Sequence, residues 1–100
     1  LVFASGQLPI DMATGKFPEG IKEQTRASLT NAAAILKEAG SDLSRVVKTT
    51  VFLSDMDNFA AMNEVYAEFF QQPYPARSAV AVKTLPKNAL VEIECVATTE

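Results

Sequence analysis

VVKTTVFL, residues 46–53, is rich in Val and Thr, and these β-branched side chains favour extended backbone. The stretch therefore predicts a β-strand near the middle of the chain. Side chains alternate along a strand, which predicts one face made of Val47, Thr49, Val51 and Leu53. The patterns on either side of this strand give the remaining elements.

A helix is predicted on each side of the central strand. Over residues 20–39 the apolar stripe recurs every three or four positions, at Ile21, Thr25, Leu29, Ala32 and Leu36. Gly40 stands where a helix C-terminal glycine belongs. The second helix is predicted over residues 57–70, with Asp57 as its N-cap and a stripe of Phe59, Met62, Tyr66 and Phe69.

Further strands are predicted over residues 1–5, 76–82 and 89–98, and a short extended piece near residues 16–17. The order of strand, helix, strand, helix, strand and strand indicates an α+β sandwich, in which two helices pack on one face of a mixed β-sheet. A chain of 100 residues without a linker or repeat forms a single domain, 1–100. Because the sequence begins within a strand, we expect a segment to precede Leu1.

The two faces of the last strand differ in character. Val91, Ile93, Cys95 and Ala97 share one face and should meet the helices, whereas Leu90, Glu92, Glu94 and Val96 share the other. On the strand before it, Ala79 and Ala81 lie on the side of Arg77, and we group them with Leu90 and Val96. This second face is either solvated or packed on another subunit; its apolar content favours the subunit, with charges kept where they line a cleft.

Composition excludes several classes of function. Nine basic and twelve acidic residues give a net charge of −3, and scattered lysines make no stripe for nucleic acid. The absence of histidine and the single cysteine disfavour a metal site and rule out a Ser-His-Asp triad. One cysteine fits a reducing compartment, and we expect a cytoplasmic protein. We expect no membrane span, because no apolar run approaches about 20 residues.

Four positions are candidates for chemistry. Arg77 follows a proline-fixed turn and could present its planar fork to a carboxylate, although a surface ion pair is the commoner role. Glu92, expected on a neighbouring strand, could hold or activate a water, or simply face solvent. Ser5 could offer its hydroxyl to a ligand, and Gly6 would allow a ligand to approach the backbone closely. The commoner role of such a pair is to cap a turn. Cys95 is predicted to be a core residue rather than a nucleophile.

Taken together, these segments resemble the RidA (YjgF-type) imine deaminase family, formerly described as endoribonuclease L-PSP. The resemblance spans all 100 residues. It rests on five segments in order, which are SGQLP at residues 5–9, VKTTVFL at 47–53, NEVY at 63–66 with Phe69-Phe70, PARS at 75–78, and LPK at 85–87 with VEIE at 91–94.

The resemblance implies a chorismate-mutase-like fold, a homotrimer with a central β-barrel, and three clefts between subunits. It also implies a 2-iminobutanoate/2-iminopropanoate deaminase that needs no cofactor or metal and removes a damaging metabolite. In that activity Arg77 would bind the substrate carboxylate and Glu92 would position or activate water. Ser5, Gly6 and the backbone near Ala79 would line the cleft, with Asn63 and Phe59 structural or peripheral.

Two features depart from the family pattern. Ala79 stands where many members have a cysteine, which removes thiol modification but not water attack. The family's N-terminal loop, which contributes a tyrosine to the cleft, is not among these 100 residues. If the protein lacked that loop, the site would be open and its activity in doubt. The alternative function is a non-enzymatic regulatory protein that binds a small carboxylate in the same cleft. Ribonuclease activity is disfavoured by the charge.

Overall fold

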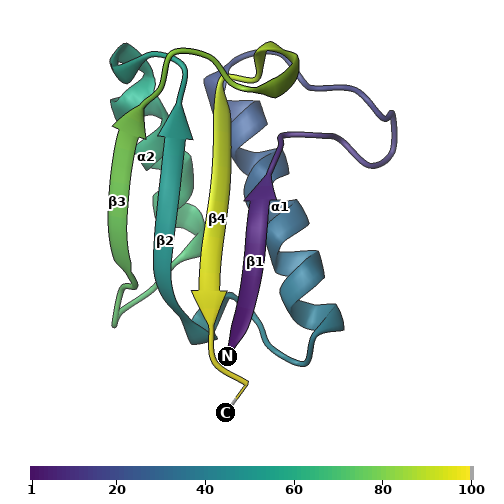
Figure 1. The fold of residues 1–100 in the computed structure, drawn as a ribbon, viewed down its shortest axis with the longest axis vertical. Coiled ribbons are helices and arrows are strands. Elements are labelled where there is room, and N and C mark those ends of the chain that lie inside the picture. The colour runs from purple at the N-terminus through teal and green to yellow at the C-terminus, as the bar shows by residue number, and fades with distance from the viewer. Residues whose placement is uncertain (100) are drawn as a thin grey trace.

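The computed structural model describes residues 1–99 as two α-helices on one face of a four-stranded sheet (Figure 1). The elements run β1 (Val2–Gln7), α1 (Ile21–Glu38), β2 (Val46–Leu53), α2 (Phe59–Phe69), β3 (Ala76–Ala81) and β4 (Val91–Ala97). Short 3-10 turns lie at Leu43–Arg45, Met56–Asn58 and Pro86–Asn88. The predicted layers and element order are confirmed.

The sheet is mixed, with the strand order β1-β4-β2-β3. β4 pairs antiparallel with both β1 and β2, whereas β2 and β3 are parallel. A parallel pair needs a crossover connection, and α2 provides it between β2 and β3. β1 and β3 are therefore the two edges of the sheet within one chain.

The core lies between the sheet and the helices. The inner face of β4 is buried as predicted, at Val91, Ile93, Cys95 and Ala97. The helices contribute buried residues that recur every three or four positions, namely Leu29, Ala32 and Leu36 from α1 and Met62, Val65 and Tyr66 from α2. Gly40 has a φ of 83°, the left-handed conformation predicted for the residue after a helix.

The predicted inner face of β2 is correct except at Val47. A register shift between Val46 and Lys48 places an irregularity in the pairing with β4. Val46 consequently turns inward and is 6% exposed, whereas Val47 is 47% exposed. An extra residue in a strand reverses the alternation on one side of it, and the sequence pattern alone does not mark the position of such a bulge.

The start of the second helix also differs from the prediction. Asp57 is not its N-cap, because α2 begins at Phe59 and is preceded by the Met56–Asn58 turn. Asp55 caps that turn, with its carboxylate accepting a hydrogen bond from the backbone N–H of Asp57 at 2.8 Å. The extended piece near residues 16–17 is only a single bridge between Asp11 and Lys16.

The side of the sheet opposite the helices is uncovered in one chain. Its strands present Phe3, Phe52, Val80 and Val96, together with Lys48, Glu92 and Glu94. Phe3 is 75% exposed and Val80 is 45% exposed. We call this the open sheet face. Large apolar side chains concentrated on an exposed face are typical of an interaction surface.

Arg77, Ala79 and Ala81 do not share the open sheet face, contrary to the prediction. They pair with Thr49, Val51 and Leu53 of β2, whose side chains are buried under the helices. Alternation fixes the two faces within a strand, but the pairing register decides which face is inward. The prediction that Glu92 lies on a strand next to that of Arg77 is also wrong, because β2 separates β3 from β4.

Candidate functional site

Arg77 is held by three side chains of α2. Its Nη1 donates a hydrogen bond of 2.6 Å to Oδ1 of Asn63. The guanidinium carbon lies 4.6 Å from the ring centroid of Tyr66 and 5.4 Å from that of Phe59. Positions 59, 63 and 66 fall on one side of a helix, so a single helical face orients the arginine.

No carboxylate pairs with Arg77 among residues 1–99. The ion pairs in this part of the chain are Lys22–Glu64, Arg26–Glu23, Arg26–Glu68 and Arg45–Asp42. A guanidinium carries five N–H donors, and the Asn63 amide oxygen is the only hydrogen-bond acceptor that Arg77 has among these residues. The alternative of a structural ion pair within the chain is therefore excluded for the described residues. Arg77 keeps its charge and donors for an anionic ligand.

Tyr66, whose ring lies against the guanidinium of Arg77, is itself held by two contacts. Its hydroxyl shares a buried hydrogen bond of 2.8 Å with Oγ1 of Thr49 on β2. Its ring lies 4.5 Å from that of Phe70, centroid to centroid. Burial raises the pKa of the Tyr66 phenol, so this ring stays neutral at physiological pH and presents a π-face to the cation.

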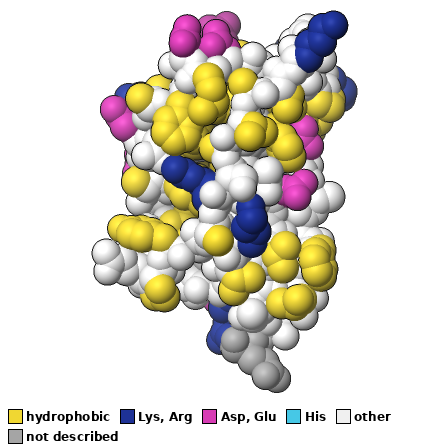
Figure 2. Space-filling model, turned by 60° about the vertical axis from the view of Figure 1, so that its left-hand side comes forward, with side chains coloured by type: hydrophobic (Ala, Val, Ile, Leu, Met, Phe, Trp, Pro, Cys, Tyr) yellow, Lys and Arg dark blue, Asp and Glu magenta, His cyan; other side chains and the backbone are white. Residues whose placement is uncertain are grey.

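A cavity of about 440 Å³ opens beside Arg77 at the edge of β3. Its walls come from α2 and from the segment leading into β3, and Arg77 is the only charged residue among the described residues that line it. Figure 2 brings this edge forward and shows apolar side chains around basic ones in the middle of the face, with acidic side chains toward the top and sides. The setting favours a ligand that is anionic at one end and apolar at the other.

Glu92 and Gly6 come together on the other side of the sheet. A Cβ atom added to Gly6 would lie 2.0 Å from Oε2 of Glu92, closer than any real contact. A side chain at position 6 would have to displace the Glu92 carboxylate, which is the end of a flexible side chain. A bulge between Ala4 and Gln7 brings this part of β1 up to β4. Ser5 is exposed next to it, and its carbonyl accepts a 3.0 Å hydrogen bond from Nε2 of Gln7.

The predicted site residues therefore form two separate groups within one chain. Arg77 and Ala79 lie on the helix side of β3, and we call Arg77 with Asn63, Tyr66 and Phe59 the arginine group. Ser5, Gly6 and Glu92 lie at β1 and β4, and we call them the glutamate group. The sheet separates Arg77 from Glu92, so the two side chains do not face a common cavity in one chain.

The contribution of α2 to the site was not predicted from the sequence. Asn63 and Phe59 were expected to be structural or peripheral and Tyr66 only a core residue, yet all three contact Arg77. The spacing of these three residues indicates that they share one face of a helix. It does not indicate that this face contacts Arg77. Cys95 is a core residue as predicted, and burial raises the pKa of its thiol, which disfavours the nucleophilic thiolate.

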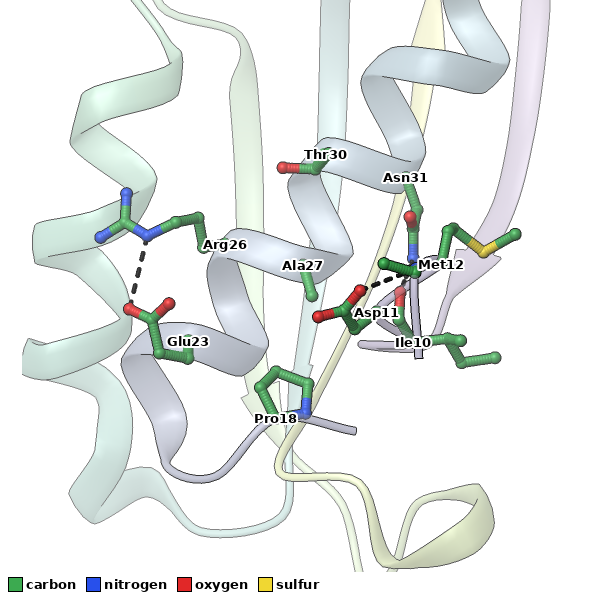
Figure 3. A pocket seen from close by; sticks show the side chains of 10 residues that line it. Ile10, Asp11, Met12, Pro18, Glu23, Arg26, Ala27, Thr30 and Asn31 are labelled. Carbon is green, nitrogen blue, oxygen red and sulfur yellow. Dashed lines mark hydrogen bonds and ion pairs between the residues drawn. The ribbon is translucent and has the colours of Figure 1, made fainter. Parts of the chain in front are cut away.

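A second cavity lies between α1 and the loop that follows β1 (Figure 3). It measures about 350 Å³ and none of the predicted site residues lines it. Asn31 fixes the loop by donating a 2.8 Å hydrogen bond to the carbonyl of Ile10. Arg26, the basic residue at this cavity, is paired with Glu23 and Glu68 and is not free for an anion. Residues 1–99 contain no group of three metal-ligating side chains and no helix long and apolar enough to cross a membrane.

The chain has two helices on a mixed sheet, and an arginine at the sheet edge has no counter-ion among residues 1–99. Comparison with known proteins identifies the family to which this architecture belongs. The family model described as Endoribonuclease L-PSP matches residues 1–99. The chain belongs to this family, which is the RidA (YjgF-type) family that its sequence resembles.

Several curated proteins are close relatives. A RutC family protein of Pyrococcus horikoshii is 55% identical over 96% of this chain and 77% of its own length. The 2-iminobutanoate/2-iminopropanoate deaminase of Capra hircus is 47% identical over 96% of this chain and 71% of its own length. A putative regulator, AldR, of Lactococcus lactis is 47% identical over 97% and 78% of the two chains.

Solved structures share the fold. A crystal structure of a putative endoribonuclease L-PSP from Entamoeba histolytica superposes with a TM-score of 0.93 and 46% identity, covering 96% of this chain and 78% of that one. E. coli TdcF with bound serine gives a TM-score of 0.89 and 42% identity, covering 95% and 77% of the two chains. A small molecule is thus bound by a relative with the same fold.

Proposed function

We propose that this protein hydrolyses reactive 2-imino acids to 2-oxo acids and ammonia. The substrates would be the imine tautomers of 2-aminoacrylate and 2-aminocrotonate, and the products pyruvate and 2-oxobutanoate. The observation that carries the proposal is Arg77, oriented by Asn63 and aromatic rings and left without a counter-ion among the described residues. Relatives named imine deaminases, about half identical to this chain, support the same reaction.

Arg77 would bind the substrate carboxylate through two parallel N–H···O bonds. Water adds to the imine carbon, the carbon–nitrogen bond then breaks, and the nitrogen leaves as ammonia while the water oxygen becomes the ketone oxygen. Glu92 would hold the attacking water and accept or return its proton. Because an imine is already electrophilic, holding it beside a positioned water supplies much of the rate. The reaction requires no cofactor or metal.

The separation of the two groups supports a site shared between chains. Arg77 and Glu92 lie on opposite sides of one sheet, so the arginine group of one subunit would face the glutamate group of another. Ser5, Gly6 and the backbone near Ala79 would line the cleft. The open sheet face, with Phe3 75% exposed, would be buried in a homotrimer around a central barrel. We place this trimer in the cytoplasm, because its one cysteine is unpaired and buried.

The test is the release of 2-oxo acid and ammonia from 2-aminoacrylate generated in situ by a dehydratase. Arg77→Ala should lower kcat/KM by about 100-fold or more, because two charge-assisted hydrogen bonds are lost. Arg45→Ala is the matched control, since Arg45 is exposed and its only ion pair among residues 1–99, to Asp42, is 3.9 Å long. Wild-type turnover in the Arg77 variant would refute the assignment.

A second candidate is a regulatory protein that binds a 2-oxo acid without turnover, which the regulator name of the Lactococcus lactis relative favours. Calorimetry with pyruvate separates the two functions. Micromolar binding that depends on Arg77, with no acceleration of imine loss, would support the regulator. Catalytic turnover would support the enzyme.

A further inference from the structure

The cavity beside Arg77 is larger than a four-carbon substrate requires. Its volume is about 440 Å³. A dry protein cavity of roughly 150 Å³ is enough to hold benzene. An imino acid whose side chain is one methyl or ethyl group would therefore leave most of the space empty once its carboxylate is on Arg77.

The walls of this cavity are aromatic. Tyr66 and Phe70 form its floor, with exposed fractions of 7% and 5% and ring planes 31° apart. Tyr74 stands at the rim and is 64% exposed. Asn63 and the hydroxyls of the tyrosines add polar surface, and no carboxylate among residues 1–99 lines the cavity to repel an anion. Aromatic rings beside one guanidinium suit a carboxylate attached to a bulky apolar group.

The backbone at Tyr74 is restricted although its side chain is exposed. It lies between Pro73 and Pro75, which fix their own φ angles, and a residue before proline is restricted to extended backbone. Its hydroxyl and ring have no hydrogen bond or ring contact among the described residues that would explain its position structurally. A tyrosine side chain has only two χ angles, so it loses little conformational entropy when a ligand packs on it.

We infer that this cavity is a side-chain subsite, and that Tyr74 is the residue that makes the protein prefer 2-imino acids with large apolar, above all aromatic, side chains. The inference rests on the proposed function and specifies its substrate class. The substrate carboxylate binds Arg77, and the side chain on C2 packs against Tyr66, Phe70 and Tyr74. The reaction at C2 is the same addition of water and loss of ammonia.

The experiment measures kcat/KM over a series of 2-imino acids generated by an amino-acid oxidase from alanine, 2-aminobutyrate, leucine and phenylalanine. We expect kcat/KM to rise along the series, by roughly 10-fold or more from the alanine to the phenylalanine product, since each buried methylene alone can contribute that factor. Tyr74→Ala should remove most of the difference, whereas Tyr74→Phe, which keeps the ring, should retain it. Ala67→Phe, which fills the cavity, should reverse the order.

The matched control is Met12→Ala, because Met12 is another large exposed side chain, 79% exposed, in the loop near α1 and away from Arg77. It should preserve the whole series, and circular dichroism checks that every variant is folded. Turnover of the small imines with kcat/KM falling along the series would overturn this inference alone. Absence of turnover with every imine would instead overturn the proposed function.

Discussion

At the scale of single residues, Arg77 owes its orientation to an amide and two aromatic rings rather than to a counter-ion. Asn63→Ala removes its 2.6 Å hydrogen bond and frees the guanidinium to move. We expect kcat/KM to fall about 10-fold, mainly through KM, since hydrogen bonds to charged groups contribute about 1.5–3 kcal/mol. Asn63→Asp should lower it further, because the new carboxylate competes with the substrate. Steady-state kinetics check both variants, and an Asn63→Asp protein as active as wild type would contradict this role.

Gly6 is constrained by contact rather than by backbone geometry. Its φ is not among the positive values, so the backbone accepts alanine, but the added Cβ would meet Glu92 at 2.0 Å. Gly6→Ala should lower kcat by displacing the Glu92 carboxylate, but it should lower the free energy of unfolding by no more than about 1 kcal/mol, because the obstacle is the end of a flexible side chain. In a Glu92→Ala background, Gly6→Ala should leave the free energy of unfolding, measured with urea, almost unchanged. If Gly6→Ala lowered the free energy of unfolding equally in both backgrounds, Glu92 would not be the group that the added Cβ displaces.

These residue contacts could be predicted only in part. A proline-fixed arginine and a Ser-Gly pair are visible in the sequence as candidates, but the contacts that the structure gives Arg77 with Asn63 and Gly6 with Glu92 were not predicted. Which side chains surround them was not visible. The partners of Arg77 lie on α2, with Asn63 14 positions earlier in the chain, and only the fold brings them together.

At the scale of elements, β2 and α2 are joined by the buried hydrogen bond between Thr49 and Tyr66. Burial raises the pKa of the Tyr66 phenol above its ordinary value of 10.0. The unfolded chain then ionises first, so this contribution to stability is complete below pH 10 and is lost as pH rises further. We expect the free energy of unfolding to fall above that pH, and less steeply in Tyr66→Phe. Urea titrations at several pH values test this, and identical slopes would contradict it.

The elements themselves were largely predictable, because their apolar periodicities are strong. Both helices and all four strands occur where the patterns place them, to within a few residues. The errors about the faces and neighbours of the strands share one cause, which is the relation of one strand to another. The bulge at Val46 and Val47 reverses one face locally, and the parallel register of β3 turns Arg77 toward the helices. The alternation of side chains within one strand predicts neither the position of a bulge nor the register with a neighbouring strand.

At the scale of the whole molecule, one chain holds both groups but keeps them apart. The sheet is covered on one side only, and its open face exposes large apolar side chains such as Phe3 beside charged ones. Assembly through the open sheet face would bury these side chains and bring each arginine group toward a neighbour's glutamate group. Activity and assembly are therefore expected to be lost together.

The most direct test of this shared site mixes two inactive variants. Arg77→Ala supplies an intact Glu92 and Glu92→Gln supplies an intact Arg77, so mixed assemblies should contain complete sites. If the two variants are coexpressed in equal amounts, random assembly makes about one quarter of the sites wild type. The mixture should then regain about one quarter of the wild-type turnover of 2-aminoacrylate. Coexpressing Arg77→Ala with the double variant Arg77→Ala/Glu92→Gln is the control and should regain none. A mixture no more active than its separate components, beside an active wild type, would contradict the account.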